Sequence, residues 1–278
     1  MPGARALEEA GIPAYAFPEP AVEALASMAL LAGRRHSLPE PARYAVDSAK
    51  VRSMLRPLKA TQGPRLGLLA LAPLLGAYGI ACAVGQAAST PREATVIAER
   101  LGFPVALKIL SPDIIHKTEV GGVMIGLNSA EEVSRGADTV LGRTRSACPT
   151  ANIAGLLVQP MVPPGRELLL GMIRDSQFGP SVTVGFGGIY VEVLKDTVTR
   201  RAPLLPDEAL EMLDGLRMAP LLHGVRGEPP VNHSALADTI CRFAQLAVDV
   251  AELREIELNP LVASPSGVVV LDARGALE

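Results

Sequence analysis

The sequence predicts an α+β fold, because helix-start signals and strand-like runs follow one another irregularly along its 278 residues. Two segments, Thr90-Pro91-Arg92-Glu93 and Ser129-Ala130-Glu131-Glu132, carry a hydroxyl residue followed three positions later by Glu, which is typical of a capped helix start. Short runs rich in Val, Ile and Leu lie between and after them, as expected of strands. Aromatic residues make up only 3% of the chain, so we expect an aliphatic core.

The elements are expected in a definite order. A strand and a helix open the chain, because Gly11-Ile12-Pro13-Ala14-Tyr15 precedes a run with helical apolar spacing over 21–32. Further helices are expected at 91–101, 129–141, 207–218 and 234–253. Strands are expected at 105–110, 120–127, 154–161, 167–173, 181–185, 189–194, 255–262 and 267–273.

Changes of composition divide the chain. Residues 1–32 are interpreted as the last strand and helix of a domain whose body is missing. Residues 33–66 contain several prolines and eight Lys or Arg against Glu40 and Asp47, so they are interpreted as a basic linker. Residues 67–278 then form the main domain, with two lobes expected at about 67–150 and 151–278.

Composition also limits the partners and the compartment. A net charge of −3 gives no electrostatic reason to expect nucleic acid. No apolar run approaches the length of a membrane helix, and the start of the chain does not look like a secretory signal. The three cysteines are isolated, without the spacing of a zinc site. We therefore expect a cytoplasmic protein that acts neither on nucleic acid nor at a membrane.

One stretch combines two residues suited to phosphate chemistry. Lys108 lies in the strand-like run 105–110, and His116 lies in the loop that follows, ahead of Gly121 and Gly122. A lysine neutralises phosphate charge, and a neutral imidazole can accept a phosphoryl group. Each residue also has a non-functional interpretation. Lys108 could extend to solvent from the edge of a strand, and His116 could be an ordinary loop histidine.

The last two strands predict a polar cluster. If they form a hairpin around Pro265-Ser266, paired residue numbers sum to 531, and Asn259 lies opposite Asp272. Period-two alternation adds Glu257 and Glu255 to the same face. Carboxylates with a carboxamide suit magnesium, which keeps waters and phosphates as its other ligands. The alternative is a hairpin with exposed polar positions.

A third region is less specific. The glycines of Gly185-Phe186-Gly187-Gly188 could let backbone approach a phosphate, although turn chemistry explains them equally well. Glu192, Asp196, Arg200 and Arg201 follow. An arginine beside carboxylates can grip phosphate or form ordinary ion pairs.

Together these motifs resemble the ATP-grasp half of the ADP-forming acyl-CoA (acetate–CoA) ligases, relatives of succinyl-CoA synthetase. The resemblance runs from about Leu74 to Arg274. It rests on eight segments in the same order: 104–109, 111–123, Gln159-Pro160-Met161, Gly165-Arg166-Glu167-Leu168, Asp175 with Phe178-Gly179-Pro180, Gly185-Phe186-Gly187-Gly188, Arg200-Arg201-Ala202-Pro203-Leu204 and Glu257-Leu258-Asn259-Pro260-Leu261.

The resemblance implies a two-lobed ATP-grasp fold that converts acid, CoA and ATP to acyl-CoA, ADP and phosphate through a phosphohistidine. It implies His116 as the phosphate acceptor on a swinging loop, with ATP or GTP and Mg²⁺ as cofactors. Lys108 would contact nucleotide phosphates, and Asn259 and Asp272 would hold magnesium. The remaining expected site residues are Gln159, Pro160 and Met161 at the adenine, Glu167 and Arg200 near ribose and phosphates, and Glu257 and Glu192 near the metal.

The resemblance also implies a partner. The family's CoA-binding and flavodoxin-like ligase domains have no counterpart in these motifs, whereas residues 1–32 resemble the end of that ligase portion. We therefore expect a CoA-binding ligase subunit, within a homo- or hetero-oligomer. Segment 69–75 departs from the family by being apolar around Pro73. The alternatives are a regulatory ATP-grasp module of a protein acetyltransferase system and a complete carboxylate–amine ligase.

Overall fold

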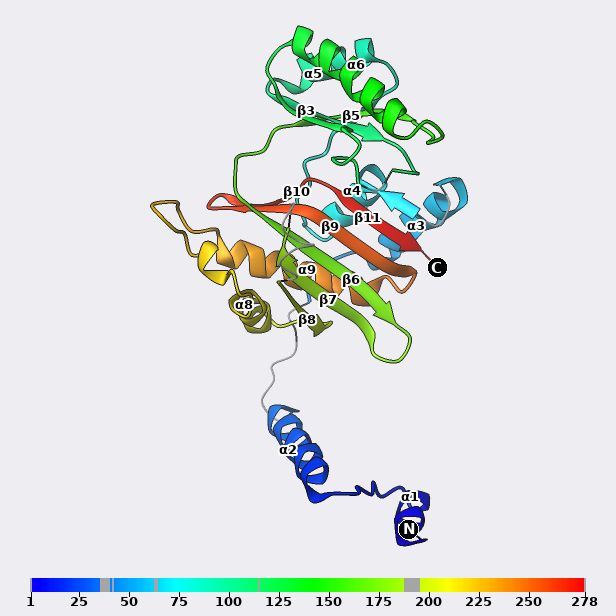
Figure 1. Cartoon of the computed structure of the whole chain (residues 1–278), viewed down its shortest axis with the longest axis vertical. Helices are drawn as coiled ribbons and strands as arrows, with labels where there is room; N and C mark the ends of the chain where they lie inside the picture. Colours follow the sequence, from blue (N-terminus) through cyan, green and yellow to red (C-terminus); the bar gives the residue numbers. More distant parts are fainter. Residues whose placement is uncertain are drawn as a thin grey trace. The chain divides into compact units, whose positions relative to one another are not determined.

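The computed structural model describes residues 2–35, 41, 43–62, 65–114, 116–187 and 196–277. Contacts within the chain divide it into two units, Met1–Ala42 and Arg43–Glu278 (Figure 1). Each unit is described separately below. Among the described residues, none of the helices has the length and apolar character needed to cross a membrane.

The first unit consists of helices α1 (Pro2–Glu9) and α2 (Pro18–Arg35). The helix expected over 21–32 lies within α2. The strand expected at 11–15 does not form, because the chain there is irregular after α1. No described side chain of this unit is buried, and Val22, Leu25 and Met28 of α2 are 63–67% exposed. The described side chains of these two helices therefore do not form a hydrophobic core.

The smaller sheet of the second unit has the strand order β2-β5-β3-β4, with antiparallel pairing throughout. Helices α5 and α6 cover one face, and their first turns are capped by Thr90 and Ser129 as the sequence predicts. Val105, Leu107 and Ile109 point into the core beneath these helices. The bounds are β2 (Gln86–Ala88), α5 (Pro91–Leu101), β3 (Val105–Leu110), β4 (Val123–Leu127), α6 (Ala130–Ala147) and β5 (Gly155–Pro160).

The larger sheet has the strand order β1-β11-β9-β6-β7-β8, and β10 pairs with β9. Along β6, Leu168, Leu170 and Met172 are buried while Glu167 and Ile173 are exposed, so the two faces alternate. The bounds are β1 (Arg65–Gly67), β6 (Arg166–Asp175), β7 (Gly179–Phe186), β8 (Thr197–Arg201), β9 (Leu253–Ser264), β10 (Gly267–Val270) and β11 (Ala273–Leu277).

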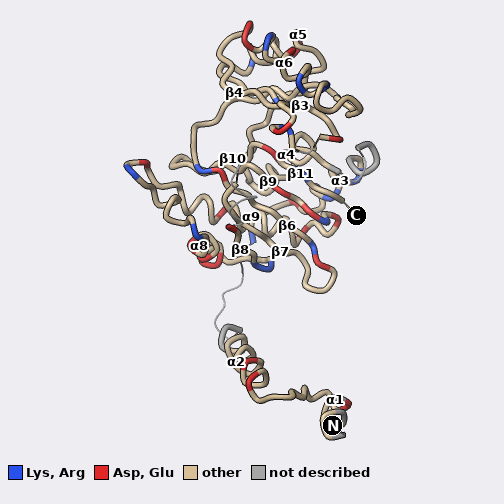
Figure 2. Tube along the Cα trace, viewed as in Figure 1, with Lys and Arg blue, Asp and Glu red and all other residues tan. Residues whose placement is uncertain are grey.

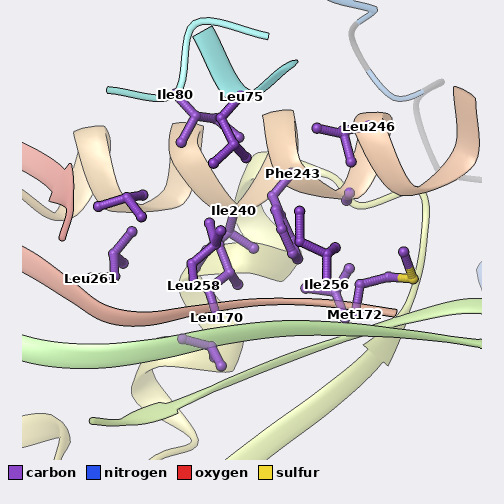
Figure 3. Packing of buried hydrophobic residues seen from close by; sticks show 14 of the residues in the cluster. Leu75, Ile80, Leu170, Met172, Ile240, Phe243, Leu246, Ile256, Leu258 and Leu261 are labelled. Carbon is purple, nitrogen blue, oxygen red and sulfur yellow. The ribbon is translucent and has the colours of Figure 1, made fainter. Parts of the chain in front are cut away.

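Helices cover one face of this larger sheet. Phe243 and Ile240 of α9 are fully buried against Leu170, Ile256 and other sheet residues, while Leu75 packs on α9 from its other side (Figure 3). Burying a large aromatic of this kind stabilises a fold by about 3–5 kcal/mol relative to Ala. The bounds are α3 (Ser48–Gln62), α4 (Leu68–Ala77), α8 (Pro206–Asp214), η2 (Ala219–Leu221) and α9 (His233–Asp249).

A polar network ties the segment before α3 to α9. The Tyr44 hydroxyl donates to Asp238 Oδ1 at 2.7 Å, and Arg242 Nε donates to Asp238 Oδ2 at 2.6 Å. The Arg242 guanidinium lies 4.0 Å from the centre of the Tyr44 ring. Burial, together with the Asp238 carboxylate, raises the pKa of Tyr44. Because Gln245 also bonds both backbone polar groups of Tyr44, this segment is firmly held by α9.

The second unit also differs from the predicted organisation. The range 33–66, expected as a linker, contains α3 and β1, and Val51 and Leu55 of α3 are buried in the core of the larger lobe. The smaller sheet includes β5, so it extends to Pro160 rather than ending at 150, while α4 packs against β1 and β11 of the larger sheet. The expected strand at 267–273 is two strands, β10 and β11. The strand expected at 189–194 lies outside the described residues.

Candidate functional site

The C-terminal hairpin has the predicted register. The pairs Gly267↔Ser264 and Val270↔Leu261 in β10 and Arg274↔Glu257 in β11 all have residue numbers that sum to 531. Asn259 and Asp272 lie opposite one another, because Asn259 N donates to the Asp272 carbonyl at 3.0 Å. The sequence prediction of this pair is therefore confirmed, although β10 and β11 are separated by residues 271 and 272.

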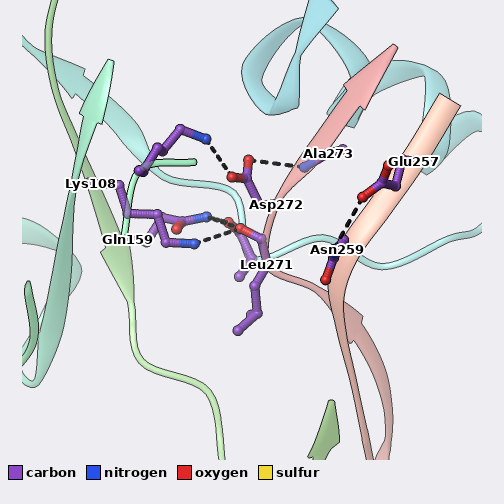
Figure 4. A network of polar contacts seen from close by, with 9 residues as sticks. Lys108, Gln159, Glu257, Asn259, Leu271, Asp272 and Ala273 are labelled. Atoms are coloured by element: carbon purple, nitrogen blue, oxygen red, sulfur yellow. Dashed lines mark hydrogen bonds and ion pairs between the residues drawn. The ribbon is translucent and has the colours of Figure 1, made fainter. Parts of the chain in front are cut away.

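The side chains of this hairpin form two separate sets (Figure 4). Asn259 Nδ2 donates to Glu257 Oε1 at 3.1 Å, and Arg274 donates to the other oxygen of Glu257 at 2.6 Å. The Asp272 carboxylate accepts from Ala273 N at 3.0 Å and forms an ion pair with Lys117. Asn259 and Glu257 thus face one another, while Asp272 reaches the loop that follows β3.

The smaller sheet supplies Lys108 and Gln159 from the face opposite its helices. In β3 and β5 the residues that alternate with the helix-facing core include Lys108, Leu157 and Gln159. Leu157 packs into the core of the larger lobe. Gln159 is almost fully buried, and its Nε2 donates to the Ala83 carbonyl at 2.6 Å and to the Leu271 carbonyl at 3.2 Å. Lys108 Nζ donates to the same Leu271 carbonyl at 2.8 Å. Strand alternation therefore delivers both side chains to the hairpin.

Lys108 has charged neighbours of both signs. Burial lowers the pKa of Lys108, and the neighbouring Lys117 ammonium lowers it further, while the Asp272 and Glu167 carboxylates act in the opposite direction. Lys117 forms an ion pair with Asp272, whereas the Lys108 ammonium donates to the neutral Leu271 carbonyl. A largely buried ammonium group held by a neutral carbonyl is suited to an anionic ligand with several oxygens, such as a polyphosphate.

His116 lies in the loop between β3 and β4. Its side chain is 58% exposed, and its Nδ1 lies 3.8 Å from Glu119 Oε1. The base of the loop is closed by backbone bonds from Ile109 N to the Gly122 carbonyl at 2.7 Å and from Gly122 N to the Lys117 carbonyl at 2.8 Å. A Cβ at Gly122 would come within 2.7 Å of Ile109 Cγ2 and 2.9 Å of the Lys117 carbonyl, so this position requires glycine.

The structure does not bring every expected residue to this cluster. Pro160 ends β5, and Met161, 37% exposed, follows it with its N–H donating to the Pro104 carbonyl at 3.1 Å. Glu167 is exposed at the start of β6 and acts electrostatically on Lys108. The Arg200 guanidinium instead pairs with Glu211 of α8 at 2.8 Å, because alternation along β8 turns it to the helix-covered face. Glu192 lies outside the described residues.

The sequence reasoning missed the role of Lys117. Its neighbour His116 was the available signal, but its partner Asp272 is 155 positions away in sequence, so only the tertiary fold joins them. Among the described residues, no group of three or more His, Cys, Asp or Glu side chains forms a metal site. Asp272, Glu257 and the Asn259 amide nevertheless provide the hard oxygen donors that magnesium prefers, so the residues present fit that ion when phosphate oxygens and water complete its shell.

Comparison with known proteins agrees with this geometry. The sequence profile of a family described as "ATP-grasp domain" matches residues 58–277. The β subunit of acetate–CoA ligase (ADP-forming) I from Pyrococcus furiosus is 41% identical over 226 residues, which are 81% of this chain and 97% of the relative.

The chain belongs to the ATP-grasp family of ADP-forming acetate–CoA ligase β subunits. Acetate–CoA ligase (ADP-forming) I from Archaeoglobus fulgidus is 38% identical over 275 residues, which are 98% of this chain but only 40% of that relative. The chain therefore spans less than half of this longer protein. The α+β fold and the recognition of this ligase family from the sequence are confirmed.

Solved structures of the dinucleotide-forming acetyl-coenzyme A synthetase 1 of Ca. Korarchaeum cryptofilum share the fold. In its complex with coenzyme A, Ca-AMPCP and HgCl⁺, the matched chain is 38% identical with a TM-score of 0.78, covering 82% of this chain and 99% of that one. In another complex, with coenzyme A and Mg-AMPPCP, the matched chain is 35% identical with a TM-score of 0.70, covering 82% of this chain and all of that one. The phosphohistidine segment of that complex is described as pointing towards the nucleotide binding site.

Proposed function

We propose that this chain is the nucleotide-binding, phosphohistidine-forming part of an ADP-forming acyl-CoA ligase. The observation that carries the proposal is the meeting of Lys108, Lys117 and Asp272 beside the loop that presents His116. Two ammonium groups suit the phosphates of a nucleoside triphosphate, and an exposed imidazole suits phosphoryl transfer. Membership of the ligase family supports the same activity.

The nucleotide, ATP or GTP, binds between the two sheets of the second unit. Lys108 contacts its phosphates, because its ammonium is held by Leu271 in the hairpin beside the carboxylate of Asp272. The segment from Gln159 to Met161 lines the adenine or guanine base where the chain leaves the smaller sheet. Glu167, exposed at the start of β6, lies near the ribose. Arg200 is paired with Glu211 of α8, and a contact with the nucleotide phosphates would require it to leave this partner.

Asp272 and Asn259 would hold Mg²⁺, with Glu257 as a further oxygen ligand. When bound, the ion neutralises phosphate charge that develops during transfer. The donor chemistry of Asp272, Asn259 and Glu257 supports this assignment, as does the Mg-AMPPCP complex of the Korarchaeum relative.

The chemical step is a phosphoryl transfer to His116. The unprotonated ring nitrogen attacks the γ-phosphorus, a P–N bond forms, and the bond to the bridging oxygen breaks so that ADP leaves with the electron pair. The phosphoryl group then passes to the carboxylate of the acid, giving an acyl phosphate. The thiol of CoA displaces phosphate from it and loses its proton. The net reaction is acid, CoA and ATP to acyl-CoA, ADP and phosphate.

A second chain completes the ligase in this proposal. The Archaeoglobus relative matches 98% of this chain and extends well beyond it, whereas the family profile starts only at residue 58. In this proposal, residues 1–32 correspond to the end of a ligase portion, and a CoA-binding ligase subunit supplies the rest in a homo- or hetero-oligomer. The three free cysteines support a cytoplasmic location, because a reducing compartment keeps thiols unpaired.

The test is transfer from γ-labelled ATP with Mg²⁺ to the purified chain. We expect an acid-labile, base-stable label on the wild-type chain, its loss in His116→Ala, and its return to ATP when ADP is added. Unlabelled GTP added as competitor identifies the preferred nucleotide. A chain that binds ATP but takes no label, even with a ligase partner supplied, would contradict the proposal and favour a regulatory ATP-grasp module.

A further inference from the structure

Lys117 follows His116 in the chain, but its side chain turns the other way. The Lys117 ammonium forms an ion pair with Asp272 of the hairpin, and the two side chains are 22% and 23% exposed. The His116 side chain is 58% exposed. Lys117 is therefore the side chain that connects the loop to the larger lobe, while its neighbour remains accessible to solvent.

The loop that carries these two residues is closed by backbone hydrogen bonds. Gly122 N donates to the Lys117 carbonyl at 2.8 Å, and Gly121 N donates to the Thr118 carbonyl at 3.1 Å, so residues 117–122 form a closed turn. Gly121 has a φ of 66°, in the left-handed region that favours glycine. His116 directly precedes this closed turn in the chain.

The Asp272 carboxylate cannot pair with the Lys117 ammonium and bind a metal ion equally well at the same time. A divalent cation at this carboxylate competes with the ammonium for the same oxygen and repels it at short range. The nearby Lys108 ammonium adds to this repulsion. Anionic phosphate oxygens that arrive with the metal offer Lys117 a new partner of the right charge.

We infer that Lys117 exchanges partners during nucleotide binding. It is the counter-ion of Asp272 while no metal is bound there, and it passes to a nucleotide phosphate when Mg²⁺ takes the carboxylate. The exchange also moves the adjacent His116, so that the imidazole approaches the phosphate to be transferred. Lys117 is thus a positioning residue, and this inference rests on the proposed function.

The test compares Lys117→Gln with Lys117→Arg in two measurements. The first is binding of Mn²⁺ without nucleotide, followed through the electron paramagnetic resonance signal of the free ion. Lys117→Gln frees Asp272 and should bind Mn²⁺ about two- to fivefold more tightly, the range expected for losing a partly exposed ion pair. Lys117→Arg keeps the charge and should remain close to wild type.

The second measurement is the rate of His116 labelling from Mg-ATP. Lys117→Gln should label at least about tenfold more slowly, because the imidazole is less well placed, and Lys117→Arg should restore part of the rate. Arg254→Gln is the matched control, since it removes a cation from the exposed Arg254–Glu255 pair, and it should change neither quantity. A purely structural role for Lys117 would not tighten metal binding while slowing transfer.

The outcomes separate this inference from the proposed function. Normal labelling of wild type, with Mn²⁺ affinity unchanged or weaker in Lys117→Gln, would overturn the partner exchange alone. Tighter Mn²⁺ binding with unchanged labelling would overturn the positioning of His116 by Lys117. A wild-type chain that takes no label would overturn the proposed function, and with it the phosphate half of the exchange.

Discussion

Two polar clusters in the second unit join segments that are distant in sequence, but their charges differ. In the cluster around Tyr44, the Asp238 carboxylate is matched by the Arg242 guanidinium, and Tyr44 completes the hydrogen bonding. In the site cluster, Lys117 pairs with Asp272, whereas the Lys108 ammonium donates to the neutral Leu271 carbonyl, with the Asp272 and Glu167 carboxylates nearby. The Asp238 carboxylate and the Arg242 guanidinium are direct partners, whereas Lys108 is suited to an additional anionic partner. Direct pairing of the charged groups therefore distinguishes the two clusters (Figure 2 shows the charged positions along the chain).

The largest expected effect on the site cluster is that of Asp272→Asn on the labelling rate. The substitution keeps the size of the side chain but removes the charge that Mg²⁺ needs, so labelling of His116 from Mg-ATP should fall about 10²–10³-fold. The melting temperature should change little, because the asparagine amide oxygen can still accept a hydrogen bond from Lys117. Labelling rate and thermal unfolding are measured on the same preparation, and a normal labelling rate would remove Asp272 from the site.

The opposite pattern is expected for Asp238→Ala. Losing the acceptor of both Tyr44 and Arg242 should lower the free energy of unfolding by about 1–3 kcal/mol. Labelling should stay near wild type in the folded protein. Urea unfolding measures the stability, with Asp138→Ala on the exposed side of α6 as the control. Stability equal to that control would show that the network does not hold the segment before α3.

Two glycines, Gly122 in the loop that carries His116 and Gly142 in α6, provide a matched comparison. Gly122→Ala places a Cβ against Ile109 and the Lys117 carbonyl, so it should destabilise the chain by about 1–2 kcal/mol and slow labelling. Gly142→Ala in α6 meets no atom within 4 Å and should stabilise it by about 0.5–1 kcal/mol. Chemical denaturation compares the two, and equal effects would show that the loop base is not tightly packed.

The smallest effect concerns the pH dependence of stability. Burial lowers the pKa of Lys108 below its ordinary value near 10.5, so the unfolded chain binds this proton more strongly than the folded chain. The resulting cost to stability is present at neutral pH and disappears as pH rises through the folded pKa towards 10.5. Lys108→Met should therefore be more stable than wild type at pH 7, with a difference that shrinks at alkaline pH. A constant difference across pH would contradict the shift.

The hairpin and capped helices were predictable from sequence because their rules are local. A symmetric turn fixed the pairing of Asn259 with Asp272, and hydroxyl caps fixed the starts of α5 and α6. Helix α4 was missed because Leu68–Ala77 is apolar on all sides and contains a proline, which hides helical periodicity. Strand β8 was missed because the Thr197–Arg201 strand is short and polar.

The site could be predicted only in part. Lys108, His116 and the hairpin carboxylates could be identified by residue type and local spacing. The ion pair of Lys117 with Asp272 and the turning of Arg200 towards α8 depend on how the lobes pack and on which face a short strand presents. Neither of these two contacts can be predicted from the local sequence pattern.

The most direct test of the account is to map the phosphate after incubation with Mg-ATP. The chain has four histidines, at 36, 116, 223 and 233. Digestion under alkaline conditions followed by tandem mass spectrometry should find phosphate on His116 and on none of the other three. Phosphate at another histidine, or on no histidine while ATP is bound, would contradict the claim that this loop is the phosphate acceptor.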